Sequence, residues 1–183
     1  YRLEDIYKVT IHELIHLLGY HKCEDIDQNN FILKYSTRYN IKGLKKIKLY
    51  ETYTEILANI FHIYFISNFT NKDNNKLFNL LLSIEIEYSI ILAQKILSLN
   101  LEKDINKYTN ILEYFIIRGE YYLNFNENDI LFILNSGITC NYDMCFLKKE
   151  LNKIEINKNI INKLKNYKEL YDSLSMILIR PQL

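Results

Sequence analysis

The sequence predicts a mainly α-helical protein, and three observations support this fold class. Apolar side chains recur at helical spacing along most of the 183 residues. The chain contains one proline and four glycines, which is too few for an all-β fold rich in tight turns. Asparagine-rich stretches at residues 71–75 and 124–128 lie where turns would separate helices. We therefore expect a single helical domain over residues 1–183.

The first predicted helix covers residues 3–18. It ends at Gly19, which is a suitable C-terminal cap because glycine adopts the left-handed conformation at little cost. A polar stretch over residues 20–42 follows, and we expect a short extended segment at residues 31–35 within it.

Helical spacing continues through most of the remaining chain. Long helices are predicted at residues 44–67, 76–99 and 105–123, a short helix or strand at residues 129–134, and one or two helices at residues 146–179. The last region, residues 146–183, is expected to form a C-terminal helical appendage to the domain.

Charge and hydropathy indicate which partners are not expected. The net charge is +1, from 23 basic and 22 acidic residues, so no nucleic-acid or membrane-surface partner is predicted. Apolar stretches such as residues 111–117 are interrupted by polar residues well short of a membrane span. The chain begins at Tyr1 rather than Met, and we therefore expect it to be a segment of a longer protein.

Cysteine usage and composition bear on the compartment. Cys23, Cys140 and Cys145 are odd in number and irregular in spacing, which favours reduced thiols over a disulfide framework. Tyrosine occurs 16 times and tryptophan is absent. This usage is similar to that of proteins from AT-rich genomes, including large DNA viruses and some protists. We expect a cytoplasmic location or, for a viral protein, the host cytoplasm or the virion.

An HExxH zinc-binding motif, His-Glu-Leu-Ile-His, occupies residues 12–16 within the first predicted helix. Because His12 and His16 are four residues apart, a helix places both imidazoles on one face, about one turn apart. Glu13 follows the first histidine, where its carboxylate can take a proton from an attacking water. Zn²⁺ is the ion that best suits imidazole and carboxylate ligands with an open fourth position.

The residues around the motif strengthen this interpretation. The three polar side chains of the motif have mostly apolar neighbours: Thr10 and Ile11 precede them, and Leu17 and Leu18 follow them. A buried helix with three ionisable groups would be costly without a metal or other partners. The alternative is an amphipathic helix whose histidines happen to face solvent.

A catalytic zinc site needs a third protein ligand, and the second long predicted helix offers two carboxylates. Glu51 and Glu55 are four residues apart and share one side of this helix with Thr54, Ala58 and His62. The small residues would allow another helix to approach closely. The alternative is that both acids belong to a solvated face. After an upstream HExxH motif, the metal-binding interpretation is favoured.

The motif and the acidic pair together resemble the gluzincin zinc metallopeptidases, which include thermolysin-like enzymes and the anthrax lethal factor group. The resemblance covers about residues 8–66. It implies that Glu51 is the third zinc ligand, that Glu55 orients His12 through a hydrogen bond, and that Glu13 is the general base. A second gluzincin pattern, in which alanine follows the ligand glutamate, would make Glu55 the ligand instead.

The resemblance also carries expectations about fold and activity. It implies a zinc-dependent hydrolase, specifically a metallopeptidase that acts on a peptide or protein. Gluzincins place a β-sheet before the metal-binding helix, but only 11 residues precede His12. We therefore expect a zincin-like metal-binding helix pair with additional helices, and a family sheet that lies upstream or is reduced. The alternative function is a non-catalytic helical interaction or structural protein, viral if its source is, with a vestigial or architectural metal site.

Four further residues have open roles. His21 stands one residue before the third histidine of the metzincin pattern HExxHxxGxxH, in which Gly19 would be the glycine. His62 fits a buried or rim histidine better than a ligand. Tyr121 and Tyr122 are candidates for stabilising an oxyanion, although core packing is the simpler interpretation.

Overall fold

The computed structural model describes residues 6–19, 28–70, 74–98, 110–126, 128–129 and 151–166. Over these ranges the fold is mainly α-helical and contains no strand, which confirms the predicted fold class. None of the described helices is long and apolar enough to cross a membrane. His21, the three cysteines and residues 130–134 lie outside the described ranges, so the predictions for them stay predictions.

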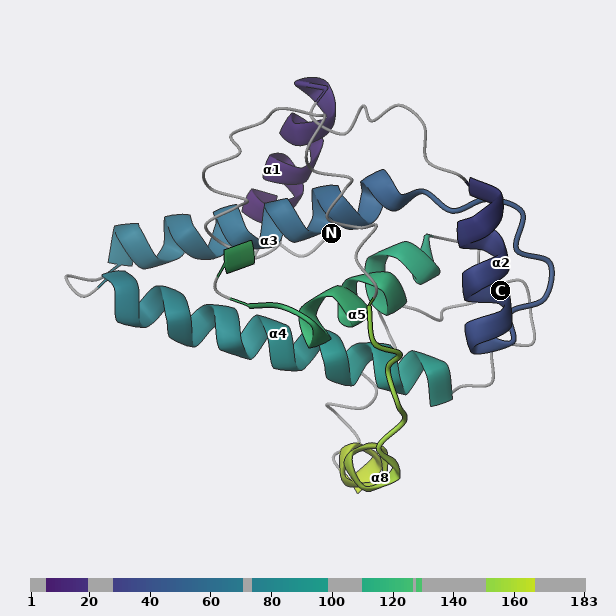
Figure 1. Ribbon diagram of the computed structural model, residues 1–183. Coiled ribbons are helices and arrows are strands. Elements are labelled where there is room, and N and C mark those ends of the chain that lie inside the picture. The colour runs from purple at the N-terminus through teal and green to yellow at the C-terminus, as the bar shows by residue number, and fades with distance from the viewer. Residues whose placement is uncertain are drawn as a thin grey trace, which may run out of the picture.

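Two long helices form the centre of the fold. Helices α3 (Leu49–Thr70) and α4 (Asn74–Ser98) run side by side in opposite directions (Figure 1). Ile56 and Ile60 of α3 and Leu92 of α4 are almost completely buried, and removing such side chains from water stabilises the pair. The structure confirms both helices, with ends that differ from the predicted ones by up to five residues.

Helix α3 begins at Leu49, five residues later than its predicted start. Residues 44–48 are not helical in the structure. Ile47 is buried there, and the backbone N–H of Lys48 donates a hydrogen bond of 2.7 Å to Oε1 of Glu113, far along the chain. A tertiary contact therefore replaces the first turn that the sequence pattern predicts.

Helix α1 (Ile6–Leu17) carries the HExxH motif and packs on α3. Its contact face includes the buried side chain of Ile15 and the partly buried Ile11. Gly19 has a φ of +76°, and its N–H donates a 3.0 Å hydrogen bond to the carbonyl of His16. The predicted glycine cap is therefore confirmed.

A π-helical segment, η3 (Leu112–Ile117), continues directly into helix α5 (Arg118–Leu123). Both pack against α3 and α4. Gly119 allows a close approach to α4, because a Cβ atom at this position would lie 2.6 Å from Cβ of Ala93. Such π-turns are uncommon and are found often at functional sites. Here the segment brings polar side chains to the N-terminal part of α3.

Helix α2 (Gln28–Tyr39) replaces the extended segment predicted at residues 31–35, so that prediction is wrong. The physical reason lies in a tertiary contact with Glu120 of α5, whose carboxylate is fully buried. Oε2 of Glu120 accepts a 2.7 Å hydrogen bond from Tyr35, and Oε1 accepts one of 2.8 Å from Arg38 and another from Tyr39. A helix presents these three donors on one side, whereas a strand would alternate them.

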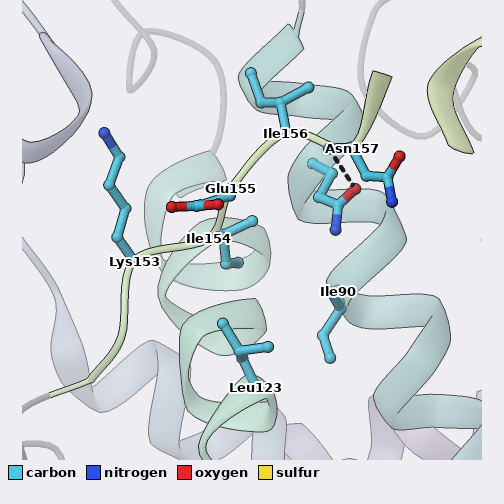
Figure 2. Close-up of a pocket in the computed structure, with 8 residues that line it drawn as sticks. Ile90, Leu123, Lys153, Ile154, Glu155, Ile156 and Asn157 are labelled. Carbon is cyan, nitrogen blue, oxygen red and sulfur yellow. Dashed lines mark hydrogen bonds between the residues drawn. The ribbon is translucent and has the colours of Figure 1, made fainter. Parts of the chain in front are cut away.

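The described part of the tail contains one helix, α8 (Lys158–Asn166), which contacts α4. The preceding residues 151–157 are not helical, so the helix predicted across them is shorter than expected. Leu151 and Ile154 are nevertheless buried, as is Ile161 of α8. This segment, α4 and the end of α5 surround a pocket of about 490 Å³ (Figure 2). Its lining includes no side chain from α1 or α3.

Candidate metal centre

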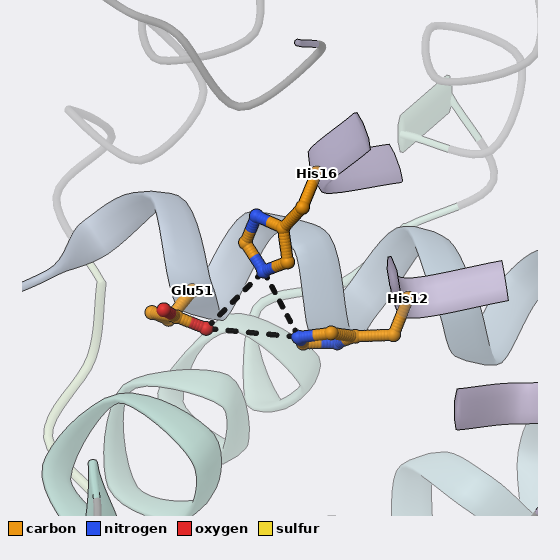
Figure 3. A group of neighbouring side chains, drawn as sticks. All are labelled: His12, His16 and Glu51. Atoms are coloured by element: carbon orange, nitrogen blue, oxygen red, sulfur yellow. Dashed lines mark hydrogen bonds and ion pairs between the residues drawn. The ribbon is translucent and has the colours of Figure 1, made fainter. Parts of the chain in front are cut away.

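Three side chains from α1 and α3 point toward one another (Figure 3). Nε2 of His12 and Nε2 of His16 are 3.1 Å apart. Oε2 of Glu51 lies 3.7 Å from the first nitrogen and 3.5 Å from the second. The three side chains are between 12% and 22% exposed, so the group lies near the surface with an accessible side.

The spacing of these atoms fits a zinc ion. Zinc bonds to imidazole nitrogen and carboxylate oxygen are about 2.0–2.2 Å long, and tetrahedral ligands are then roughly 3.3–3.5 Å apart. The observed separations of 3.1, 3.5 and 3.7 Å are close to that triangle. Two imidazoles and one carboxylate also leave a fourth position for water or substrate. The residues present therefore fit a catalytic type of zinc site.

Glu55 lies on the other side of the His12 ring. Nδ1 of His12 is 3.2 Å from Oε2 of Glu55, so the ring can donate its Nδ1 proton to this carboxylate. The neutral tautomer then carries its lone pair on Nε2, the atom that faces His16 and Glu51. Such a contact fixes both the orientation and the tautomer of a metal-binding histidine.

The carboxylate of Glu55 is surrounded by positive charge. Its Oε1 accepts a hydrogen bond from Lys8 of α1 and one of 2.8 Å from Nη1 of Arg118. Burial alone would raise the pKa of Glu55, but the hydrogen bond with His12 and the charges of Lys8 and Arg118 hold this pKa well below its ordinary value. Glu55 is therefore a carboxylate at neutral pH, as an orienting group for His12 must be.

Two tyrosines stand beside the candidate ligand group His12, His16 and Glu51. The hydroxyl of Tyr114 donates a 2.8 Å hydrogen bond to Oε2 of Glu51, and its ring lies edge-on to His12 with centroids 6.1 Å apart. The ring of Tyr50 stands edge-on to His16 at 6.2 Å. Burial, together with Glu51, raises the pKa of Tyr114, which keeps its phenol protonated as a donor.

The remaining predicted site residues have these positions. Glu13 follows His12 on α1 and is exposed to solvent. His62 of α3 is half-buried and is not part of the group of possible ligands among the described residues. Tyr121 and Tyr122 are only 1% and 2% exposed and pack edge-to-face against Phe125 in the core, as the packing interpretation expects.

The sequence interpretation did not include Lys8, Tyr114 or Arg118. Tyr114 and Arg118 reach the acidic pair from 63 residues further along the chain, so no local motif connects them to it. One signal was available for Lys8: it precedes His12 by four residues and therefore shares its helix face. A comparable signal links Tyr114 with Arg118, which have the same spacing as Glu51 and Glu55.

No family model, curated protein or solved structure matches this chain. We therefore infer the function from the geometry of the described residues.

Proposed function

We propose that this chain is a zinc-dependent hydrolase of the gluzincin type and that it acts on peptide bonds. The observation that supports this most strongly is the triangle of His12 Nε2, His16 Nε2 and Glu51 Oε2, with edges of 3.1 to 3.7 Å. An HExxH helix, an acidic ligand from a second helix and an orienting carboxylate on the first histidine are the features expected of that class.

Each residue then has a chemical role. A bound zinc ion supplies Lewis acidity and makes water nucleophilic at neutral pH. Glu13 accepts a proton from the attacking water and passes it to the leaving amine. Its exposed position on α1 agrees with a role toward substrate rather than as a ligand. Glu55 keeps the His12 lone pair directed at the ligand group.

Tyr114 supports a hydrolytic role in addition to metal binding. Its hydroxyl already lies within hydrogen-bond distance of the ligand oxygen of Glu51, at the edge of the group. From there it can donate to the oxygen of a scissile carbonyl as negative charge develops on it. A purely architectural zinc site is usually closed by a fourth protein ligand, and none is present among the described residues.

The test is cleavage of a diverse peptide library by zinc-loaded protein. We expect cleavage that a chelator abolishes, that added zinc restores, and that His16→Ala lacks. His62→Ala is the matched control, because it removes a histidine from α3 outside the ligand group. Zinc binding at one equivalent with no cleavage of any peptide would contradict the hydrolase and would favour an architectural metal site.

A further inference from the structure

Arg118 is buried beneath the candidate metal centre without belonging to it. Its side chain is 5% exposed, and Nη1 lies 2.8 Å from Oε1 of Glu55. The same nitrogen is 4.0 Å from Oε1 of Glu85 on α4. A buried guanidinium between two carboxylates is stable only while both charges remain close.

Glu85 is itself held in place. Its Oε1 accepts hydrogen bonds of 2.8 Å from Asn59 on α3 and 3.0 Å from Ser89 on α4. Arg118 is therefore connected to both long helices, to α3 through Glu55 and to α4 through Glu85. These contacts limit how far the guanidinium can move. Its position matters because it binds Glu55, which in turn contacts the candidate metal ligand His12.

The two oxygens of Glu55 have separate partners. Oε2 faces His12, while Oε1 binds Lys8 and Arg118. A rotation of this carboxylate that broke the contact with His12 would also weaken two charge-assisted hydrogen bonds, which are roughly twice as strong as neutral ones. The positive charges thus keep Oε2 facing His12.

One helical element contacts both members of the acidic pair. Tyr114 donates to Glu51 and Arg118 donates to Glu55. The two donors are four residues apart in the sequence, and so are the two acceptors. The continuous segment of η3 and α5 therefore aligns with the acidic face of α3. It fixes the ligand carboxylate at one position and the orienting carboxylate at the other.

We propose that Arg118, together with Lys8, is a positioning residue that sets metal affinity through Glu55. It touches neither the ion nor substrate, and it acts by keeping Glu55 aligned with Nδ1 of His12. The inference rests on the proposed function, because it concerns the same metal centre. It goes further by assigning a role to side chains outside the HExxH motif and the acidic pair.

The test measures zinc affinity by competition with a chelator in the parent, Arg118→Lys, Glu55→Gln and the double variant. Arg118→Lys keeps the charge but cannot span both carboxylates. We expect it to weaken zinc binding about tenfold or more, as loss of outer-shell support typically does. In the Glu55→Gln background the same change should have almost no further effect, because the two substitutions act through one contact.

A spectroscopic readout needs no metal. In the metal-free parent, the Nδ1 proton of His12 should give a downfield NMR signal from its hydrogen bond to Glu55. This signal should shift or broaden in Arg118→Lys. Lys8→Met provides a second variant at a more exposed position. It replaces Arg118→Lys in the test if that variant does not fold. It should also weaken zinc binding, again only when Glu55 is present.

Arg38→Lys is the matched control, because it changes an arginine that binds a different buried glutamate, Glu120, 2.8 Å away. It should lower stability without changing zinc affinity. Unchanged affinity in folded Arg118→Lys, or an equal loss with and without Glu55, would overturn the inference. A parent that binds no zinc would overturn it together with the metal centre. A parent that binds zinc but cleaves no peptide would refute the proposed function alone.

Discussion

The hydroxyl of Tyr114 donates a 2.8 Å hydrogen bond to Oε2 of Glu51, although 63 residues separate them in the sequence. The accepting oxygen is the same atom that faces the imidazoles of His12 and His16. The phenol therefore lies beside the candidate metal centre. In the proposed hydrolase, it could donate to the oxygen of a substrate carbonyl.

Tyr114→Phe should keep zinc and lose much of the hydrolytic rate. Removing one donor to a developing oxyanion typically lowers kcat by about 10²–10³. KM should change little, because the bond strengthens only in the transition state. Steady-state kinetics on a cleaved peptide would measure this. Tyr64→Phe, a change of an exposed tyrosine on α3, is the control and should have parental kinetics. Equal kcat values for the two variants would exclude this role of Tyr114.

The chain should bind about one zinc ion per molecule, because three donor atoms converge at one point of the described structure. Elemental analysis of protein purified with and without added zinc would measure the ratio. His16→Ala should bind less than a tenth of an equivalent under the same conditions. A parent without stoichiometric metal after zinc supplementation would contradict the metal centre.

Glu13→Gln should separate metal binding from chemistry. Glu13 is exposed and outside the ligand group, so zinc content should equal that of the parent. Hydrolysis should fall roughly a thousandfold or more, because an amide cannot accept the proton of water. Zinc content and kcat are measured on the same preparation. A variant that cleaves as fast as the parent would show that another group is the base.

Glu113, the glutamate of η3, should make stability depend on pH. It is 1% exposed, and its Oε2 has no hydrogen-bond partner among the described residues. Burial raises its pKa above the ordinary value of 4.5, and Glu51 raises it further, although the hydrogen bond from Lys48 opposes this. A raised pKa in the folded state gives stability that is present below pH 4.5 and is lost as pH rises through the folded value.

Glu113→Gln should therefore be more stable than the parent at pH 7 and lose this advantage toward pH 4. Its amide keeps an oxygen that can accept the Lys48 N–H but carries no charge to bury. Denaturant unfolding of both metal-free proteins between pH 4 and 8 would measure the difference in free energy. A constant difference across that range would show that Glu113 does not titrate differently in the folded state.

Gly119→Ala should destabilise the fold through its contact with α4. A Cβ at this position would lie 2.6 Å from Cβ of Ala93 and 2.8 Å from Cδ1 of Ile154. Overpacking of this kind costs about 1–3 kcal/mol. Gly43→Ala is an instructive control, because Gly43 has open space and a φ of +76°. It should cost about 1–2 kcal/mol through backbone strain alone.

The two glycines can be distinguished by a second substitution. Ala93→Gly should recover part of the stability lost in Gly119→Ala, because it removes the atom in the closest contact. The same substitution should not help Gly43→Ala. Thermal or denaturant unfolding of the single and double variants would measure this. If the double variant lost as much stability as Gly119→Ala and Ala93→Gly lose together, the close approach of α5 to α4 would be contradicted.

The sequence by itself determined the helical class and identified His12 and His16 as candidate metal ligands, with Glu51 or Glu55 as the third. Periodicity and the scarcity of proline and glycine indicate α3 and α4, and spacing places His12 and His16 on one face of α1. These features are local, since a helix repeats every 3.6 residues and its faces follow from the order of side chains. The cap of α1 at Gly19 is local for the same reason.

Only the tertiary structure decided which distant groups meet. Residues 31–35 are part of α2, and Tyr35 donates a hydrogen bond to Glu120 from there. Helix α3 begins later than the sequence predicts, and Lys48 before it donates a hydrogen bond to Glu113. The tertiary structure also placed Tyr114 and Arg118 against the acidic pair. These outcomes depend on buried polar groups finding partners far along the chain, and no local pattern of residues encodes such a pairing.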